Sequence, residues 1–599
     1  MFKMIKQLFS LLSEKQVRQF YTLQALVVVM AFAELLGIAS IAPFMALVGD
    51  ISIIENGGIF TKLYEFSGLT KPTDFLFYVG LFVLITLTIS TLVSMYTTWR
   101  LSLYGARVGT EIADRLYSYY MKEDWQFHAS GSSAQLTKQV STEAMRITGG
   151  IIQPLLRMNA KIILTFFIAM AILIYDPLVA ISGLTIFVIA YLTLYKLVRK
   201  KLVYNGRKLS AVATQRFRLM NEGFGGIKDV LLLDRSYDFV DSFRKSGATF
   251  ARAQGTNLAI AQVPRYFIEL IAFGTMISLV LLLIKLYDGD LSQVLPVLAV
   301  YALAAFKLLP AFQQIYGGIT QIKGSVAAFE AIEQDLTKSA ESLEEHKSKP
   351  PLKPMSFKNQ LILKDIRFKY PDKEVAAVNG INMTIPANSV IGLVGASGSG
   401  KSTLIDIILG LLVPQDGEIY VDNVQITSEN KRSWQNKLGF VPQSIFLSEG
   451  TIAENVAFGL PAQGVDFEQV NKAIKLSNLD ELVRELPKGL DTKVGERGIQ
   501  LSGGQRQRIG IARALYHEAS ILVFDEATSA LDGITEKVIM NAIHNFSGQK
   551  TIIMIAHRLK TVEKCDIIYL MKQGKIIDSG TYKELVDNNV EFREMAAHS

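Results

Sequence analysis

The sequence predicts two joined folds: an α-helical transmembrane domain with six spans over residues 1–332, and an α/β domain with a phosphate-binding loop over residues 355–599. Long apolar runs recur in the first half of the chain and stop near residue 350. The second half contains short apolar segments typical of buried strands, and one of them leads into a glycine-rich loop. A chain of 599 residues also exceeds what one hydrophobic core supports, so two or more domains are expected.

Six apolar runs are long enough to cross a bilayer as helices, which takes about 20 residues. They cover 22–48, 75–98, 149–174, 178–198, 260–286 and 291–318. The sixth run contains Lys307 and is the least regular of the six. Between the first two runs, residues 50–73 show an amphipathic pattern, which fits either an ordered loop or a helix on the outer leaflet.

Basic residues predict the orientation of these spans. Lys and Arg gather in the N-terminal stretch and in residues 196–208, whereas the turn at 175–177 has none. Because cytoplasmic segments contain the excess of Lys and Arg, the N-terminus is placed in the cytoplasm, and six spans return the chain there. The first 20 residues lack a cleavable signal pattern and indicate an amphipathic interfacial helix.

The amino-acid composition limits the kinds of molecule that this chain is expected to bind. Apolar residues make up 50% of the chain, and the net charge is +7 at pH 7. A basic chain can bind nucleic acid or the anionic surface of a membrane. The apolar runs favour the second, so membrane lipids are the predicted partner and nucleic acid is not. The single cysteine, Cys565, excludes an intrachain disulfide and a cysteine-based zinc cluster.

Three segments connect these parts. Residues 99–148 and 199–259 show helical periodicity with mixed charges, which predicts cytoplasmic extensions of the spanning helices. Residues 333–354 are charged and end in prolines, a composition typical of a linker between domains.

An apolar strand at 390–394 leads directly into a phosphate-binding pattern at residues 395–402. Glycines there let the backbone curl, so that its N–H groups point at phosphate oxygens, and the following helix adds its positive end. In this pattern Lys401 reaches the β- and γ-phosphates, and the hydroxyl of Ser402 binds Mg²⁺.

A second buried strand, residues 521–524, ends in Asp525 and Glu526. An aspartate at a strand end beside a phosphate loop can hold Mg²⁺ through water, and the following glutamate can polarise an attacking water as general base. The alternative is a strand followed by a solvated acidic turn, which the nearby phosphate loop disfavours.

Between these two elements, Leu501-Ser502-Gly503-Gly504-Gln505 resembles the signature motif of ATP-binding cassette (ABC) proteins. Further motifs of that family follow in its order over residues 355–590. The resemblance implies adenine stacking by Tyr370, sensing of Mg²⁺ and of the lytic water by Gln443, and contact of His557 with the γ-phosphate. It also implies a partner-crossing loop at 529–532 and a loop at 492–498 that touches the membrane domain. The residues expected to bind ATP are Tyr370, Gly395, Ser397, Gly398, Gly400, Lys401, Ser402, Thr403, Ser502, Gly503, Gly504 and Gln505, and those expected to bind Mg²⁺ are Ser402, Gln443 and Asp525.

The resemblance further implies that two copies enclose two ATP molecules, with the signature residues of one copy facing the γ-phosphate of the other. Every catalytic position is present, so a homodimer with two active sites is expected, although a heterodimer also fits. A membrane domain that precedes the ATPase domain resembles an exporter-type half transporter. In that family the cytoplasmic extensions bend into the ATPase, here near 125–135 and 219–229.

Among the charged residues inside apolar runs are Glu34 in the first, Arg265 and Glu269 in the fifth, and Lys307 in the sixth. Charges at membrane depth are expensive and need a partner. One interpretation is internal ion pairing, with long side chains reaching the cytoplasmic leaflet; the other is a basic wall that attracts an anionic head group such as a pyrophosphate.

The membrane half resembles the bacterial lipid-linked oligosaccharide flippase of protein N-glycosylation, which implies an inner-membrane location. This similarity rests on Val263-Pro264-Arg265 with Glu269, on the Glu34 segment with Pro43-Phe44, and on the amphipathic outer segment. Arg265 matches one cavity arginine of that family, whereas Lys307 replaces another. Another family arginine falls near Ser90, a departure that leaves a related glycolipid open. The alternatives are a multidrug or general lipid exporter, a soluble nucleic-acid ATPase and an ATP-gated channel.

Overall fold

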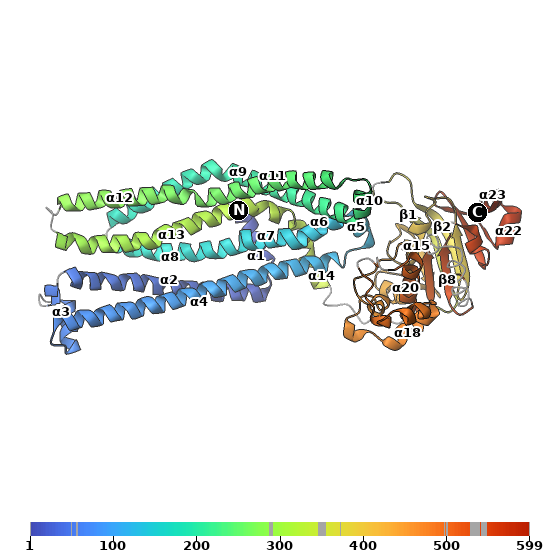
Figure 1. The fold of residues 1–599 in the computed structure, drawn as a ribbon, viewed down its shortest axis with the longest axis horizontal. Coiled ribbons are helices and arrows are strands. Elements are labelled where there is room, and N and C mark those ends of the chain that lie inside the picture. Colours follow the sequence, from blue (N-terminus) through green and yellow to red (C-terminus); the bar gives the residue numbers. More distant parts are fainter. Residues whose placement is uncertain are drawn as a thin grey trace. The chain divides into compact units, whose positions relative to one another are not determined.

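The computed structural model describes residues 2–49, 51–54, 58–175, 177–286, 291–345, 355–371, 373–495, 498, 501–526, 540, 548–556 and 558–597 (Figure 1). The chain divides into two compact units. The first contains residues 1–123 and 130–348, and the second contains residues 124–129 and 349–599.

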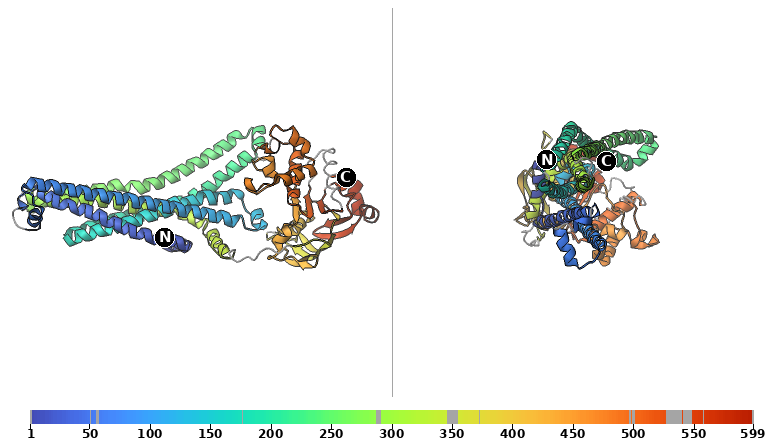
Figure 2. Two further views of the ribbon diagram at one scale, coloured as in Figure 1. Left: turned by 90° about the horizontal axis from the view of Figure 1, so that it is seen from below. Right: turned by 90° about the vertical axis from the view of Figure 1, so that its left-hand side faces the viewer.

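The first unit is entirely helical in its described residues. Helix α2 lies beside α4, and α8 and α9 pack against α13 (Figures 1 and 2). Its α-helices are α1 (Phe2–Ser10), α2 (Glu14–Gly49), α3 (Ile59–Ser67), α4 (Pro72–Tyr120), α6 (Ser133–Lys138), α7 (Ala144–Ile147), α8 (Gln153–Tyr175), α9 (Pro177–Gly225), α10 (Ile227–Leu232), α11 (Ser236–Gln262), α12 (Pro264–Leu286), α13 (Leu291–Glu330) and α14 (Glu333–Glu345). Three short helical segments join them: η1 (Ile51–Ile54) and the π-helical turns η2 (Gln139–Glu143) and η3 (Thr148–Ile152).

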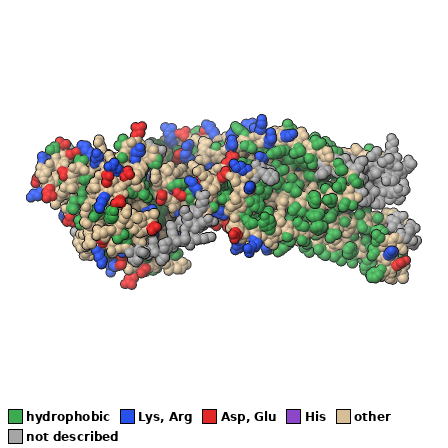
Figure 3. All heavy atoms as spheres, turned by 180° about the vertical axis from the view of Figure 1, so that it is seen from behind, with side chains coloured by type: hydrophobic (Ala, Val, Ile, Leu, Met, Phe, Trp, Pro, Cys, Tyr) green, Lys and Arg blue, Asp and Glu red, His purple; other side chains and the backbone are tan. Residues whose placement is uncertain are grey.

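Three of the described helical stretches are long and apolar enough to cross a membrane: Glu14–Gly49, Pro72–Tyr120 and Ser133–Ile174. They contain the first three predicted runs. The other three runs lie on α9, α12 and α13, where many side chains fall outside the described residues, so the count of six spans stays a prediction. Large apolar side chains cover much of this unit's visible face, as lipid contact requires (Figure 3).

Helix α3 resolves the two alternatives for residues 50–73 in favour of a helix. Phe60 and Tyr64 pack against a small core formed by Leu47, Ile54 and Phe75. On the other face, Ile59 and Phe66 are exposed, so α3 is amphipathic as its sequence pattern indicates.

The segment predicted as a linker, 333–354, is helical over Glu333–Glu345, where it forms α14. This helix packs on α4, and Tyr120 donates a hydrogen bond of 2.7 Å to the Asp335 carboxylate. Burial of Leu336 explains why these residues fold onto the first unit despite their charge. The rest of the predicted linker, residues 346–354, lies outside the described residues.

A buried ionic cluster joins the third apolar stretch to α9. The Glu143 side chain is fully buried; one carboxylate oxygen lies 3.3 Å from Lys138 Nζ and the other 2.7 Å from Arg146 Nη1. The Ser210 hydroxyl on α9 donates to the same carboxylate at 3.0 Å. A buried carboxylate is stable only with such partners, and this cluster fixes α7 against α9.

The second unit is an α/β domain with two sheets (Figure 1). One is antiparallel in the order β2-β1-β4-β5, and the other has the order β10-β9-β3-β8-β7-β6, parallel except for β10. The strands are β1 (Gln360–Phe368), β2 (Val378–Pro386), β3 (Val390–Val394), β4 (Asp416–Val421), β5 (Val424–Gln425), β6 (Leu438–Val441), β7 (Ile521–Asp525), β8 (Thr551–Ile555), β9 (Ile567–Lys572) and β10 (Lys575–Gly580). The helices are α5 (Trp125–Ser130), α15 (Lys401–Ile408), α16 (Lys431–Gln435), α17 (Ile452–Val456), α18 (Phe467–Leu476), α19 (Asp480–Glu485), α20 (Gly503–Tyr516), α22 (Tyr582–Asn588) and α23 (Val590–Ala597), with short turns η5 (Ala462–Gly464), η6 (Gly489–Asp491) and η8 (Leu559–Val562).

The central strands β3 and β8 are buried along their whole length, which explains their continuous apolar sequences. Helix α15 covers one face of the sheet with Leu404, Ile405 and Ile408, while α17, α18 and α20 form a second core on the other. Burial on both faces is the arrangement expected of parallel strands.

Candidate functional site

The parallel sheet gathers motifs that are far apart in the sequence at one edge. Strands β9, β3, β8, β7 and β6 run in the same direction, so their carboxyl ends meet there. The phosphate loop follows β3, Gln443 follows β6, and Glu526 follows β7. This edge is where ligands bind in open α/β sheets. His557 also follows β8 in the chain but lies outside the described residues.

Three glycines shape the phosphate loop. Gly395, Gly398 and Gly400 have φ angles of 148°, 79° and 100°, a region that side chains rarely adopt. A Cβ atom on Gly395 would overlap the carbonyl oxygen of Met571, and one on Gly400 would overlap the carbonyl oxygen of Ala377. The loop therefore lies directly on neighbouring backbone, and only glycine permits that approach.

The buried Lys401 side chain lies inside this loop. Its Nζ donates to the carbonyl oxygens of Gly395 and Ala396 at 2.8 and 3.0 Å. Burial lowers the pKa of Lys401, while the carboxylates of Glu526 and Asp525 act to raise it. The hydroxyl of Ser399, which sequence reasoning did not single out, is buried and has no hydrogen-bond partner among the described residues. A caged ammonium and an unsatisfied hydroxyl fit a phosphate group, whose oxygens accept from both.

At the same sheet edge, Gln443 and Glu526 form a pair. Gln443 Nε2 donates to Glu526 Oε2 at 2.6 Å, which fixes one carboxylate oxygen. Glu526 has a φ of 49°, a strained value for a residue with a side chain and a frequent feature of active sites. A positioned carboxylate at this point can accept a proton from water.

The donor set also fits Mg²⁺, which prefers oxygen ligands and usually keeps phosphates and waters in its shell. Ser402 has an exposed side chain at the start of α15, and Asp525 is half-buried at the end of β7. The described residues contain no cluster of three or more His, Cys, Asp or Glu side chains that could hold a metal alone. Ser402, Gln443 and Asp525 would hold Mg²⁺ only together with nucleotide phosphates.

The aromatic ring of Tyr370 is placed beside the loop. Its hydroxyl lies 3.3 Å from Thr403 Oγ1 on α15, and its ring packs edge-on against Phe368 with centroids 5.0 Å apart. Ser397 is exposed in the loop between these elements. The geometry thus brings the predicted adenine-stacking residue to the nucleotide-binding edge.

The signature residues lie on a different element. Ser502 begins α20 with a capping box, in which its backbone N–H donates to Gln505 Oε1 at 2.8 Å and its hydroxyl accepts from Gln505 N. Ser502 is exposed, and its hydrogen bonds among the described residues are local, with none to the phosphate loop. Gly503 and Gly504 form the first turn of the helix. The predicted partner-crossing loop, 529–532, lies outside the described residues.

The second unit includes six residues from the N-terminal half, Asp124–Ala129, which contain the start of α5. Within this unit Trp125 donates a hydrogen bond to the Asp406 carboxylate, and Lys431 lies 3.9 Å from Asp124. The first predicted bend, 125–135, therefore begins inside the ATPase unit. The second predicted bend coincides with the break between α9 and α10 in the first unit.

Glu34, Lys307, Arg265 and Glu269, the membrane charges predicted as substrate-binding residues, form two pairs. Lys307 Nζ lies 3.3 Å from Glu34 Oε2, and the Ser94 hydroxyl donates to the other oxygen of Glu34 at 2.9 Å. Arg265 pairs with Glu269 one helical turn away. These contacts favour internal ion pairing over an open basic wall.

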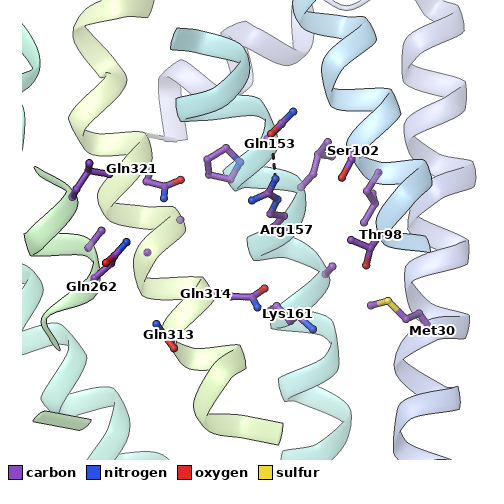
Figure 4. Close-up of a pocket in the computed structure, with 18 residues that line it drawn as sticks. Met30, Thr98, Ser102, Gln153, Arg157, Lys161, Gln262, Gln313, Gln314 and Gln321 are labelled. Carbon is purple, nitrogen blue, oxygen red and sulfur yellow. Dashed lines mark hydrogen bonds between the residues drawn. The ribbon is translucent and has the colours of Figure 1, made fainter. Parts of the chain in front are cut away.

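A cavity of about 540 Å³ lies elsewhere in the first unit, between α2, α4, α8, α11 and α13 (Figure 4). It contains Arg157 and Lys161, which sequence reasoning missed. The available signal was a pair of cations four residues apart inside the third apolar run.

Known proteins are similar to this chain both in its ATPase half and over most of its length. The ABC transporter family model matches residues 378–529. The chain is 30% identical to the ATP-dependent lipid A-core flippase of Saccharophagus degradans over 531 residues, which cover 86% of each chain. It is 42% identical to the ABC multidrug transporter MDR2 of Trichophyton interdigitale over 233 residues, 39% of this chain and 18% of that one. A solved bacterial Atm1-family ABC exporter with ATP bound shares the fold with a TM-score of 0.74 and 22% identity, over 97% of this chain and 98% of that chain.

The helical membrane unit and the phosphate-loop unit together define an ATPase fused to a transport domain. The chain belongs to the ABC transporter family and is an exporter-type half transporter. The predicted fold class and the predicted ATPase activity are confirmed, and ATP is the nucleotide that this domain binds.

Proposed function

We propose that this half transporter uses ATP hydrolysis to move a lipid-linked oligosaccharide or a related glycolipid across the bacterial inner membrane. The observation that carries the proposal is the caged Lys401 at the same sheet edge as the Gln443–Glu526 pair, in a chain that also contains membrane-length helices. The similarity to a lipid A-core flippase over 86% of both chains supports a lipid cargo. In this proposal six spans place the N-terminus and the ATPase domain in the cytoplasm.

The working unit in this proposal is a homodimer. The exposed Ser502 and the partly buried Gly503 and Gly504 of one copy complete the ATP site of the other, opposite Lys401. Glu526 acts as general base on the attacking water, and Gln443 orients its carboxylate. His557 contacts the γ-phosphate. Mg²⁺ supplies neutralisation of phosphate charge when bound. Loss of the γ-phosphate contact then favours separation of the two domains.

A multidrug or general lipid exporter is the second candidate, because the ATPase half is 42% identical to part of a multidrug transporter. The two functions differ in what stimulates ATP hydrolysis. A drug exporter responds to varied hydrophobic cations, whereas the proposed flippase responds to anionic lipid-linked saccharides.

The proposal is tested with the full chain reconstituted in liposomes that contain a fluorescent undecaprenyl-pyrophosphate saccharide. ATP should move the saccharide to the opposite leaflet. Glu526→Gln should still bind ATP but hydrolyse it and flip lipid at least 100-fold more slowly, because a positioned general base contributes about 10² to 10⁴. Glu518→Gln, which removes an exposed carboxylate paired with Lys472, is the matched control and should behave as wild type. Wild-type turnover by Glu526→Gln would refute its role, and stimulation by hydrophobic cations alone would favour the drug exporter.

A further inference from the structure

The cavity between α2, α4, α8, α11 and α13 is a chemically distinct site in the membrane unit. Its volume of about 540 Å³ is within the range of about 300 to 1,000 Å³ that small-molecule sites occupy. Among the described residues, its lining contains two cations and five glutamines but no Asp or Glu. The residues that the argument uses are Arg157, Lys161, Gln153, Gln262, Gln314 and Gln321.

Arg157 and Lys161 differ from Lys307 and Arg265 in their partners. Arg157 donates to Gln153 Oε1 at 3.2 Å, and the described residues give neither cation an ion pair. Lys307 and Arg265, in contrast, each lie against a carboxylate. Two like charges one helical turn apart also repel each other. Both cations lie near the middle of an apolar run, where a charge without a partner marks a functional site.

The uncharged residues of the cavity lining indicate which other chemical groups an anionic ligand of this site would have. Figure 4 shows glutamines of α11 and α13 on one side of the cavity and Arg157 and Lys161 of α8 on the other. Each glutamine amide can donate and accept, as sugar hydroxyls do. Met30, Leu101 and Leu258 add apolar surface to the same cavity. A ligand that satisfies all three surfaces has an anionic group, hydroxyls and an apolar part.

We propose that this cavity binds the phosphate or pyrophosphate group of an amphiphilic lipid, with Arg157 and Lys161 as the anion-binding residues and the glutamines as partners of its sugar. The inference rests on the proposed flippase function and assigns its head-group site to α8. Guanidinium and phosphate form strong charge-assisted hydrogen bonds, and the ammonium of Lys161 adds a second charge. In this arrangement the ligand supplies the negative charge that the protein itself does not.

The test is equilibrium binding to the full chain in nanodiscs, with radiolabelled farnesyl diphosphate as probe. Farnesol and inorganic pyrophosphate are the competitors, because they separate the apolar and anionic parts of the probe. Wild type should bind farnesyl diphosphate at least tenfold more tightly than either competitor. The double variant Arg157→Gln, Lys161→Gln should lose at least tenfold in affinity, and the loss should shrink at high salt.

Matched variants keep the result interpretable. Arg100→Gln removes a cation of α4 that lies over the Tyr96 ring and outside the cavity lining, so it should bind the probe within about twofold of wild type. Lys161→Arg keeps the charge and should retain binding. Thermal unfolding in detergent shows whether the first unit of each variant is folded.

The other possible results each test one part of the proposal. Wild-type affinity of the double variant, or an equal loss in Arg100→Gln, would overturn the site. Farnesol binding as tightly as the diphosphate would overturn its anionic character, and inorganic pyrophosphate binding as tightly would assign a soluble anion in place of a lipid. Selective binding without ATP-dependent flipping would refute the flippase function and leave the site standing. Wild-type flipping by the double variant would refute the site alone.

Discussion

Asp406 gives a prediction whose size and sign both follow from the structure. Its carboxyl group lies on α15, one turn after the phosphate loop, and is only partly exposed. Its pKa is raised from 3.8 to about 6, mainly by burial and also by the Asp525 carboxylate, while the hydrogen bond from Trp125 opposes the rise. We predict that Asp406→Asn stabilises the ATPase unit at neutral pH, because Asn removes the charge and keeps an acceptor for Trp125.

The magnitude follows from linkage between protonation and folding. A rise from 3.8 to about 6 corresponds to roughly 3 kcal/mol against the charged form. Since the carboxyl is partly exposed, solvent screening reduces this to about 1 to 2 kcal/mol. The folded domain binds the proton more strongly than the unfolded chain, so the penalty is full above pH 6. It shrinks as the pH falls from about 6 to 3.8 and is absent below that.

The assay is urea unfolding of the full chain in detergent, followed by tryptophan fluorescence from pH 4 to pH 8. Trp434 reports on this region because it is fully buried and donates to the Ile408 carbonyl oxygen at 2.8 Å. Asp406→Asn should unfold at higher urea than wild type at pH 7.5 and at the same urea near pH 4. An unchanged midpoint at pH 7.5, or an advantage that persists at pH 4, would refute the reasoning.

Asp422→Asn is the control with the opposite sign. Burial alone would raise the pKa of Asp422, but N–H donors of Lys358, Asn359 and Gln360, at 2.6, 2.8 and 3.0 Å, lower it. Its stabilising effect is present above the unfolded pKa and is lost as the pH falls through the lowered folded value. The Asn variant should therefore be less stable than wild type at pH 7.5 and should approach wild type in acid.

Two further predictions test the ionic cluster and the phosphate loop. Glu143→Gln leaves two cations in a buried cluster without a counter-charge and should destabilise the first unit by about 3 to 5 kcal/mol in thermal unfolding. Glu330→Gln breaks only an exposed pair and should cost less than about 1 kcal/mol, so equal effects would contradict the first prediction. Gly395→Ala should abolish ATP binding in a fluorescent-nucleotide assay, because its Cβ would overlap the Met571 carbonyl oxygen. Gly398→Ala meets open space and should retain most binding despite a positive φ; similar losses in both would refute the packing argument.

The ATPase half was predictable from sequence because its chemistry is local. The phosphate loop places Gly395 and Lys401 a few residues apart, and strand order then brings Glu526 to the same sheet edge. The buried hydroxyl of Ser399 was not predicted, since its loss of solvent depends on the loop lying against β9. The hydrogen bond between Trp125 and Asp406 was also hidden, because it joins residues about 280 positions apart in the chain.

In the membrane half, the apolar runs could be predicted from the sequence, but the partners of the charged residues could not. Glu34 and Lys307 are 273 residues apart, and only the packing of α13 near α2 brings them within 3.3 Å. A window of about 20 residues also averages two cations into an apolar run, which is why Arg157 and Lys161 were overlooked. Helix periodicity predicts the helix face on which each charged residue lies. The partner of that residue depends on which other helix packs against that face.

Whether a charged residue in a membrane helix indicates a ligand site therefore depends on whether the fold places a residue of opposite charge beside it. Lys307 and Lys161 are the same residue type at similar depth in apolar runs. Glu34 offsets the cost of Lys307, so its presence requires no ligand. The described residues offer Lys161 no carboxylate, and Arg157 beside it increases the repulsion. The free energy that internal pairing does not supply must come from outside the chain, and in a cavity lined by glutamines an anionic, hydroxyl-rich lipid is the partner that can supply it.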